Sequence, residues 1–222
     1  MNDQTIELIG NSLWPLLRAT VTSTIPLTLI SFVLGLVVAL AVALMRLSKV
    51  RVVSWLARAY VSAIRGTPLL LQLFIIYYGL PALGVRFDPF PAAVLAFTLN
   101  VGGYAAEVIR SAILAVPKGQ WEAASTVGMD YVTTLRRVVL PQATRTAIPP
   151  LSNTLISLVK DTSLASTIQV TELLRVAQEA AAPTYEFFAL YGVAAVYYWV
   201  VCLALSFGQA RLEERENRYV AA

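Results

Sequence analysis

The sequence predicts an all-α integral membrane protein with five transmembrane helices, and two observations lead to this fold class. Of the 222 residues, 58% are hydrophobic and 14% are charged, whereas a soluble domain contains roughly 45–50% apolar and about 25% charged residues. The charges are also segregated, so that long stretches carry none. A helix needs about 18 apolar residues to cross a hydrocarbon core roughly 30 Å thick. Composition and charge pattern together exclude an ordinary soluble domain.

Four spans follow from charge-free runs of this length, which lie between residues 18 and 46, 65 and 86, 88 and 107, and 186 and 211. A fifth stretch is mostly apolar but contains Lys160 and Asp161. Ionisable residues inside a span are rare and are functional by default, so we interpret it as a span with functional charges; a re-entrant or interfacial segment is the alternative. The predicted spans are residues 20–45, 57–80, 90–113, 146–170 and 187–209.

The segments outside these spans divide the rest of the chain. Residues 1–19 are expected to form an external amphipathic helix lying on the membrane, because apolar residues recur at helical spacing from Ile6 to Leu16. The acidic Asp3 and Glu7 argue against a signal peptide. We expect a transmembrane domain at residues 20–210, with a cytoplasmic loop at 114–145, and a charged cytoplasmic tail at 211–222.

The basic residues predict the orientation. Twelve of the 17 lysines and arginines lie after the first span, between the third and fourth spans, or after the fifth. The positive-inside rule places these segments in the cytoplasm, with the N-terminus outside and the C-terminus inside. The net charge of +4 therefore reflects topology, and it lacks the clustered basic face that nucleic-acid binding requires.

Several chemistries are poor candidates for this chain. It has one cysteine, Cys202, so no intrachain disulfide is possible, and it has no histidine, the commonest metal ligand. No G-x-x-x-x-G-K-[ST] phosphate loop occurs, so the chain is not expected to hydrolyse ATP. We expect neither a metal nor a cofactor in this chain.

Small residues predict close helix packing. Gly35, Ala39 and Ala43 recur at four-residue spacing, as do Gly102 and Ala106. Such faces let helix backbones approach one another. Five spans provide a small helical surface, so these faces also predict a second membrane subunit, identical or related, with a pathway between the two.

The cytoplasmic loop contains the most informative pattern, whose fixed positions are Glu122, Ala123, Ala124, Gly128, Leu140 and Pro141. A helix carrying Glu122 is expected to end near Gly128, because glycine is a permissive C-terminal cap. A second helix is expected from about Tyr131, stopping before Pro141. The pattern resembles the EAA loop of ATP-binding-cassette importer permeases, with Val138 in place of the usual isoleucine. The resemblance implies that Glu122 to Pro141 couples the chain to a cytoplasmic ATPase.

A second resemblance covers nearly the whole chain, from about residue 19 to residue 207. Residues 65–70, continuing through 72–81, and residues 157–164 are similar to signatures of the polar amino-acid uptake permeases, the histidine and glutamine permease group. Residues 43–48 and 140–153 resemble the L-cystine permeases within that group.

The resemblance implies a bacterial inner-membrane importer driven by ATP. Its implied partners are a second permease subunit, two cytoplasmic ATPase subunits that bind ATP and Mg, an external solute-binding protein, an amino-acid substrate and the lipid bilayer.

Polar residues within the spans indicate a pathway. They share helix faces in three sets: Asn100 with Tyr104 and Glu107; Arg65 with Gln72; and Asn153 with Ser157 and Lys160. Structural hydrogen bonds between helices are the alternative. Gly66 and Pro68 could loosen the helix around Thr67 and free backbone groups, although an ordinary proline kink explains them equally well. The candidate pathway residues are Arg65, Gly66, Thr67, Gln72, Asn100, Tyr104, Glu107, Ser157, Lys160, Asp161, Thr162 and Ser163.

Charge placement indicates how an amino acid could be held. Arg65 and Lys160 balance Glu107 and Asp161, so the interior can be neutral. Asp161 suits a substrate ammonium. Arg65, Lys160 or backbone amides near Gly66 suit its carboxylate.

Three other classes of function are weighed against this interpretation. A gradient-driven transporter or channel would use the same buried charges, but would not need the coupling pattern. A membrane enzyme would pair Glu107 with Asp161, yet these lie at different expected depths. A structural scaffold would associate with partners without transporting anything.

Overall fold

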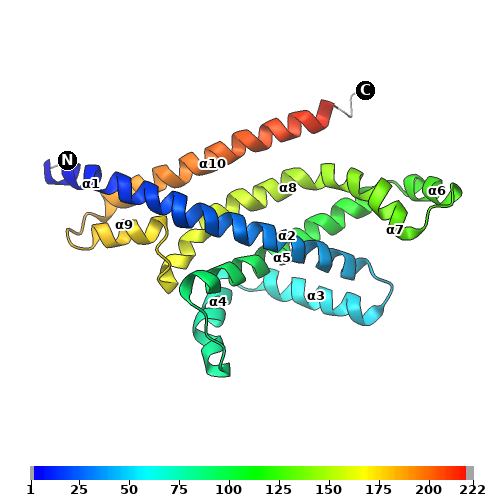
Figure 1. The fold of residues 1–222 in the computed structure, drawn as a ribbon, viewed down its shortest axis with the longest axis horizontal. Helices are drawn as coiled ribbons and strands as arrows, with labels where there is room; N and C mark the ends of the chain where they lie inside the picture. Colours follow the sequence, from blue (N-terminus) through cyan, green and yellow to red (C-terminus); the bar gives the residue numbers. More distant parts are fainter. Residues whose placement is uncertain (1–2, 219–222) are drawn as a thin grey trace.

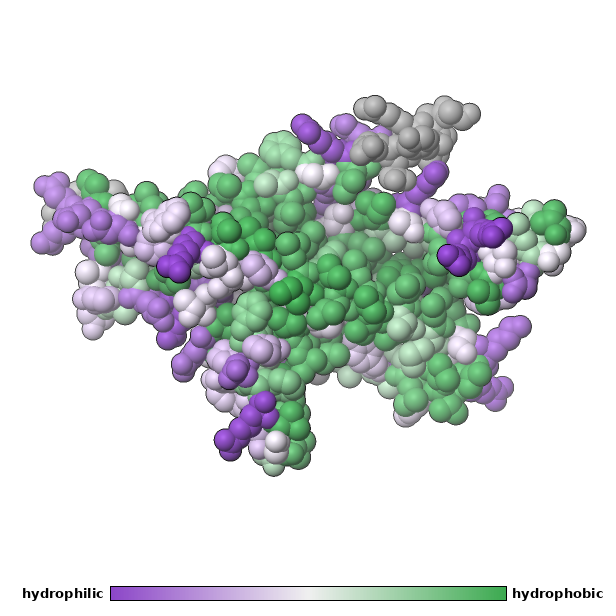
Figure 2. All heavy atoms as spheres, in the orientation of Figure 1, coloured by the Kyte–Doolittle hydropathy of each residue, from purple (hydrophilic) through white to green (hydrophobic). Residues whose placement is uncertain are grey.

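The computed structural model describes residues 3–218, with side chains described as far as residue 214, and this part of the chain contains helices and no strands. Figure 1 shows an elongated bundle in which α1 and α9 lie at one end and α6 lies at the other. In Figure 2, apolar residues form a broad band across the middle, and hydrophilic residues gather toward the ends. This distribution fits a helical membrane protein.

The first helix is longer than expected. The α1 helix (Asp3–Ala19), a π-helical turn (Thr20–Thr24) and α2 (Ile25–Leu47) run without a break over 45 residues. The N-terminal residues are helical as predicted, but they do not form a separate helix. Leu16 is fully buried and packs with residues of α9 and α10, so protein contacts hold this segment.

The second predicted span is interrupted. The α3 helix (Arg51–Gly66) and the segment that begins with α4 (Leu69–Phe74) meet at a bend of 108°. A π-turn (Ile75–Gly79) and a 3-10 turn (Leu80–Leu83) continue α4. The segment predicted as the second span, residues 57–80, is therefore not one unbroken helix, and the break falls at Thr67, where the sequence allowed the helix to loosen.

The remaining elements follow in order. They are α5 (Pro89–Ala115), α6 (Lys118–Thr126), α7 (Tyr131–Thr134), a π-turn (Leu135–Val139), α8 (Leu140–Asp161), a 3-10 segment (Thr162–Ile168), α9 (Leu173–Ala181) and α10 (Phe187–Arg218). By length and composition, three helical stretches among the described residues could each cross a membrane: residues 3–47, 89–115 and 187–214. Counting α3 and α4 as one broken span gives a fourth.

Close packing against α5 forms the centre of the bundle. A Cβ atom added at Gly35 of α2 would lie 2.5 Å from Val101 Cγ1 on α5, and one added at Gly103 would lie 2.5 Å from Ile64 Cγ2 on α3. Both distances are shorter than carbon atoms tolerate, so glycine is required for these approaches. The predicted small faces are thus buried within this chain, where Ala39 and Ala106 are fully covered. They do not provide the surface for a second subunit.

Candidate functional site

A break in the chain between α3 and α4 organises the site. Thr67 and Pro68 both have extended backbone angles, which place them outside either helix. Proline disfavours the helical conformation of the residue before it and has no N–H to donate, so the helix ends at Gly66. The Thr67 hydroxyl donates to the Ala63 carbonyl oxygen at 2.8 Å, which satisfies one carbonyl of the last turn of α3.

Gln72 holds this break together. Its amide nitrogen donates to the carbonyl oxygens of Ile64 and Thr67 at 2.8 and 3.2 Å and to the Thr67 hydroxyl at 3.0 Å. Its amide oxygen accepts a hydrogen bond from Asn100 Nδ2 on α5 at 3.0 Å. Because a helix break separates Arg65 from Gln72, the prediction that they share a helix face is wrong. Gln72 stabilises the bend from inside the protein.

A cavity of about 470 Å³ is bounded by the break and the start of α4 on one side and by α5 and α8 on the others. Five predicted pathway residues line it: Thr67, Asn100, Tyr104, Ser157 and Asp161. Its other lining residues are Pro68, Leu69, Val101, Pro150, Asn153, Thr154 and Leu158. The structure therefore brings polar residues of the break, α5 and α8 together around one space large enough for a small molecule.

The cavity face of α8 repeats every four residues. Asn153, Ser157 and Asp161 all line the cavity, whereas Lys160 does not and is exposed elsewhere on the helix. The predicted face of Asn153, Ser157 and Lys160 is therefore correct in its first two members. Asp161 is partly buried and makes no hydrogen bond or ion pair within the described residues. Its carboxylate is the one charged group among the described lining residues of the cavity, and the nearby cation is that of the adjacent Lys160.

Arg65 reaches the cavity indirectly. Its guanidinium carbon lies 5.6 Å from the centre of the Tyr104 ring, within the range of a cation–π contact. Tyr104 itself lines the cavity. The cation is thus held one side chain away from the space that Asp161 faces.

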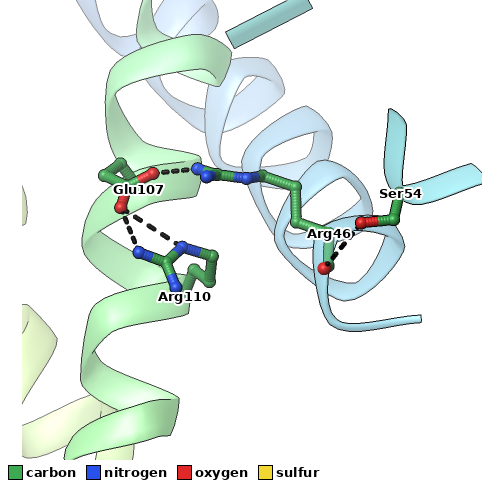
Figure 3. Close-up of polar contacts among 4 residues, drawn as sticks. All are labelled: Arg46, Ser54, Glu107 and Arg110. Atoms are coloured by element: carbon green, nitrogen blue, oxygen red, sulfur yellow. Dashed lines mark hydrogen bonds and ion pairs between the residues drawn. The ribbon is translucent and has the colours of Figure 1, made fainter. Parts of the chain in front are cut away.

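Glu107 has different partners from those expected. Figure 3 shows its carboxylate between Arg46 of α2 and Arg110 of α5, with Arg110 Nε at 3.2 Å and Arg46 Nη1 in direct contact. The expectation that Arg65 and Lys160 balance Glu107 and Asp161 is therefore wrong for Glu107. This carboxylate lies outside the cavity lining, and its ion pairs join α2 to α5.

Three other candidates lie away from the cavity lining. Thr162 and Ser163 begin the 3-10 segment, where their hydroxyls donate to the carbonyls of Val159 and Lys160, each at 2.6 Å. They cap the end of α8. Gly66 is the last residue of α3, and no atom would lie within 4 Å of an added Cβ.

The loop after α5 forms the predicted elbow. Glu122, Ala123 and Ala124 lie on α6, and Gly128 follows that helix with a φ of +77°. The N–H groups of Gly128 and Met129 donate to the carbonyls of Ser125 and Ala124, each at 3.0 Å. These two hydrogen bonds, with glycine in the left-handed conformation, form a Schellman cap, and the helix ends near Gly128 as predicted.

The second arm of the elbow begins at Tyr131, also as predicted. The Asp130 side chain accepts a hydrogen bond from Thr133 N at 3.0 Å, which caps α7. The hydrogen bonds from Thr133 hold the pKa of the Asp130 carboxyl below its usual range. The Trp121 and Tyr131 rings stack across the elbow with centres 5.8 Å apart. Capping and stacking fix the angle between the two arms.

The second arm does not stop before Pro141. A π-turn over Leu135–Val139 leads into α8, and Leu140 N donates to Leu135 O, five residues back. Pro141 follows this π-turn directly, and the helix continues past it although proline has no N–H to donate. Residues 131–161 therefore form one continuous helical run from the elbow to the cavity.

Sequence reasoning missed two features of this site. The neutral cavity residues Pro150 and Thr154 lie on the α8 face of Asp161, 11 and 7 residues before it, so helical spacing counted back from Asp161 would have found them. The role of Arg46 depends on a contact with Glu107, 61 residues away, which no local pattern signals.

Comparison with known proteins relates this arrangement to transporters. Residues 31–218 match the family described as binding-protein-dependent transport system inner membrane component. The chain is 57% identical to the L-cystine transport system permease protein TcyB of Bacillus subtilis (strain 168) over 216 residues, 97% of this chain and 92% of that protein. It is 41% identical over 197 residues to the probable amino-acid ABC transporter permease protein YckA of the same organism, covering 89% of this chain and 87% of that protein.

A solved structure has the same fold. The crystal structure of an amino acid ABC transporter with histidines matches with a TM-score of 0.88 at 34% identity, covering 97% of this chain and 100% of that one. The fold and the elbow thus define a membrane permease subunit of an ATP-binding-cassette importer, a class whose subunits are not themselves enzymes. The chain belongs to the family of binding-protein-dependent transport system inner membrane components.

Proposed function

We propose that this chain carries polar amino acids, L-cystine among them, through the cavity beside the α3–α4 break. The observation that carries the proposal is the Asp161 carboxylate in the cavity wall, with the Arg65 guanidinium behind Tyr104. An amino acid presents an ammonium that Asp161 can bind and a carboxylate that a guanidinium can approach. The identity to an L-cystine permease supports cystine as the first substrate to test.

Energy is supplied by other subunits in this proposal. The α6–α7 elbow presents Val127, Tyr131 and Val132 at its surface, each more than half exposed. These side chains suit a cleft of a cytoplasmic ATPase, which binds ATP and Mg. The full transporter contains a second permease subunit, two ATPase subunits and an external solute-binding protein. ATP binding moves the coupling segments and turns the pathway outward.

The proposed topology has five spans, with the N-terminus outside and the C-terminus in the cytoplasm of a bacterial cell. The remaining span in this proposal is α8, because its 22 residues are long enough to cross the hydrocarbon core and it packs against the membrane-crossing helices α5 and α10. The elbow then faces the cytoplasm, where an ATPase is available.

Uptake of labelled amino acids tests the function. The chain is reconstituted in vesicles with its copurifying partners, with ATP on the cytoplasmic side and the binding protein outside. Uptake that requires both supports an importer, and the panel ranks cystine against other amino acids. Uptake driven by an ion gradient without ATP would contradict the proposal in favour of a secondary transporter.

A further inference from the structure

A basic pocket lies at the turn between α2 and α3, separate from the cavity. It encloses about 450 Å³ and is lined by Ser48, Lys49, Arg51, Ser54, Trp55 and Arg58. Three of these six side chains are cations, and none is acidic. Figure 1 places this turn at the same end of the molecule as α6, and Figure 2 shows hydrophilic residues there at the tip of an apolar surface.

The three cations of this pocket are not neutralised. Lys49, Arg51 and Arg58 form no ion pair and no side-chain hydrogen bond among the described residues. The acid on the neighbouring part of α5, Glu107, is already held by Arg46 and Arg110. Like charges brought together in one concave site repel each other, so an anion bound there would be stabilised by all three.

The floor of the pocket is fixed and retains a hydrogen-bond donor. Ser54 Oγ donates to the Arg46 carbonyl oxygen at 3.2 Å, which ties the start of α3 to the end of α2 (Figure 3). Ser48 Oγ accepts from Val50 N at 3.2 Å, which leaves its own O–H free to donate to a ligand oxygen. Cations and a hydroxyl donor are the groups that bind phosphate oxygens.

The surroundings of the pocket indicate a lipid surface. The apolar helix α2 ends at Leu47, immediately before the pocket begins. Val52 and Trp55 are 66% and 65% exposed, so apolar side chains stand open beside the cations. Tryptophan and basic residues at the end of an apolar helix are typical of the boundary between hydrocarbon and water. A soluble anion would contact only the cations of the pocket. A phospholipid would contact the cations with its headgroup and the exposed apolar side chains with its acyl chains.

We propose that this pocket binds the phosphate headgroup of an anionic phospholipid, with the acyl chains lying along Val52, Trp55 and Leu56. Anionic lipids are attracted to basic segments next to membrane helices, and here the cations converge on one concave site. The site is distinct from the transport cavity, so the inference does not depend on which substrate is carried.

Native mass spectrometry of the full chain in detergent, titrated with phosphatidylglycerol or phosphatidylcholine, tests this site. The expected result is binding of phosphatidylglycerol about tenfold tighter than phosphatidylcholine. The variant K49Q/R51Q/R58Q reduces that preference to within twofold. The matched control K118Q/R136Q/R137Q removes three charges from the elbow region and keeps the preference. An equal loss in both variants would overturn the site, because it would mean that general positive charge attracts the lipid.

Two further arms separate the lipid from other ligands. Inorganic phosphate is added as a competitor; no displacement of phosphatidylglycerol supports a lipid site, and displacement at equal concentration overturns it in favour of a soluble anion.

The single variant K49Q guards against misfolding of the triple variant, and its preference for phosphatidylglycerol is expected to fall about two- to threefold. If the triple variant keeps its lipid but loses its copurifying ATPase, the pocket is a protein interface and the proposal fails.

Discussion

Two prolines of this chain have opposite effects on the helix around them. At Pro68 the backbone leaves the helix and the flanking segments bend by 108°. At Pro141 the helix continues into α8. The difference lies in the partners that the backbone finds. The Ile64 carbonyl, which Pro68 cannot serve, accepts from the Gln72 side chain instead. A π-turn precedes Pro141 and carries the helix past it. A proline alone therefore does not decide whether a helix breaks. The hydrogen bonds that replace the one its missing N–H would have made decide it.

Removing the Gln72 side chain tests this explanation most strongly. Gln72→Leu leaves the carbonyls of Ile64 and Thr67 and the amide of Asn100 without these partners. Because unsatisfied buried groups cost about 1–3 kcal/mol each, we expect a loss of stability on the order of 3 kcal/mol. Thermal unfolding in detergent measures it. The exposed Gln4→Leu is the control, and equal melting of the two variants would contradict the role of Gln72.

Removing the charge of Asp161, at the cavity end of the run over residues 131–161, is expected to have the next largest effect. Asp161→Asn keeps the shape of the side chain but removes the negative charge facing the break. We expect uptake to fall at least about tenfold, because a charge-assisted hydrogen bond to an ammonium is lost, while copurification with the ATPase is unchanged. Asp88→Asn, in the exposed turn before α5, serves as the control. Unchanged uptake and concentration dependence would remove Asp161 from the site.

Strain at the elbow tests the other end of the same run. Gly128→Val places a β-branched residue at a φ of +77°, at a cost of about 1–3 kcal/mol. The protein should insert normally but copurify poorly with its ATPase. Gly84→Val carries similar strain at a φ of +82° in a turn remote from the elbow. If both variants lose the ATPase equally, the elbow has no special part in coupling.

The smallest effect is expected at Pro141. Since the π-turn already accommodates this residue, Pro141→Ala should change the free energy of unfolding by less than about 1 kcal/mol and uptake by less than about twofold. Thermal unfolding and uptake assays on the same preparation provide the measurement. A large change would show that the proline itself shapes the run.

Local patterns could be predicted from sequence, and distant contacts could not. The cap at Gly128 and the helix start at Tyr131 depend on neighbouring residues, so spacing was sufficient to predict them. The helix-face argument for Arg65 and Gln72 assumed an unbroken helix, and it failed once Thr67 became extended. The cavity face of α8 was predicted in part: Asn153 and Ser157 lie on it, but Asp161 stands there in place of Lys160.

The small-residue faces illustrate the same limit. The repeats at Gly35 and Gly102 predicted close packing, and the close packing is present. The sequence could not tell whether the partner helix belonged to this chain or to another. Contacts between α2 and α5 within the chain use both faces, so the surface that meets a second subunit has to be sought elsewhere.

The continuous run over residues 131–161 has a mechanical consequence. At 1.5 Å per residue it is about 45 Å long, and it carries the elbow at one end and Asp161 at the other. It can act as a lever arm, in which a small movement of the elbow becomes a larger movement of Asp161. A tilt of about 5° would swing the far end by about 4 Å, comparable to the diameter of a methyl group. A small rotation of the elbow would then shift Asp161 relative to Tyr104 across the cavity.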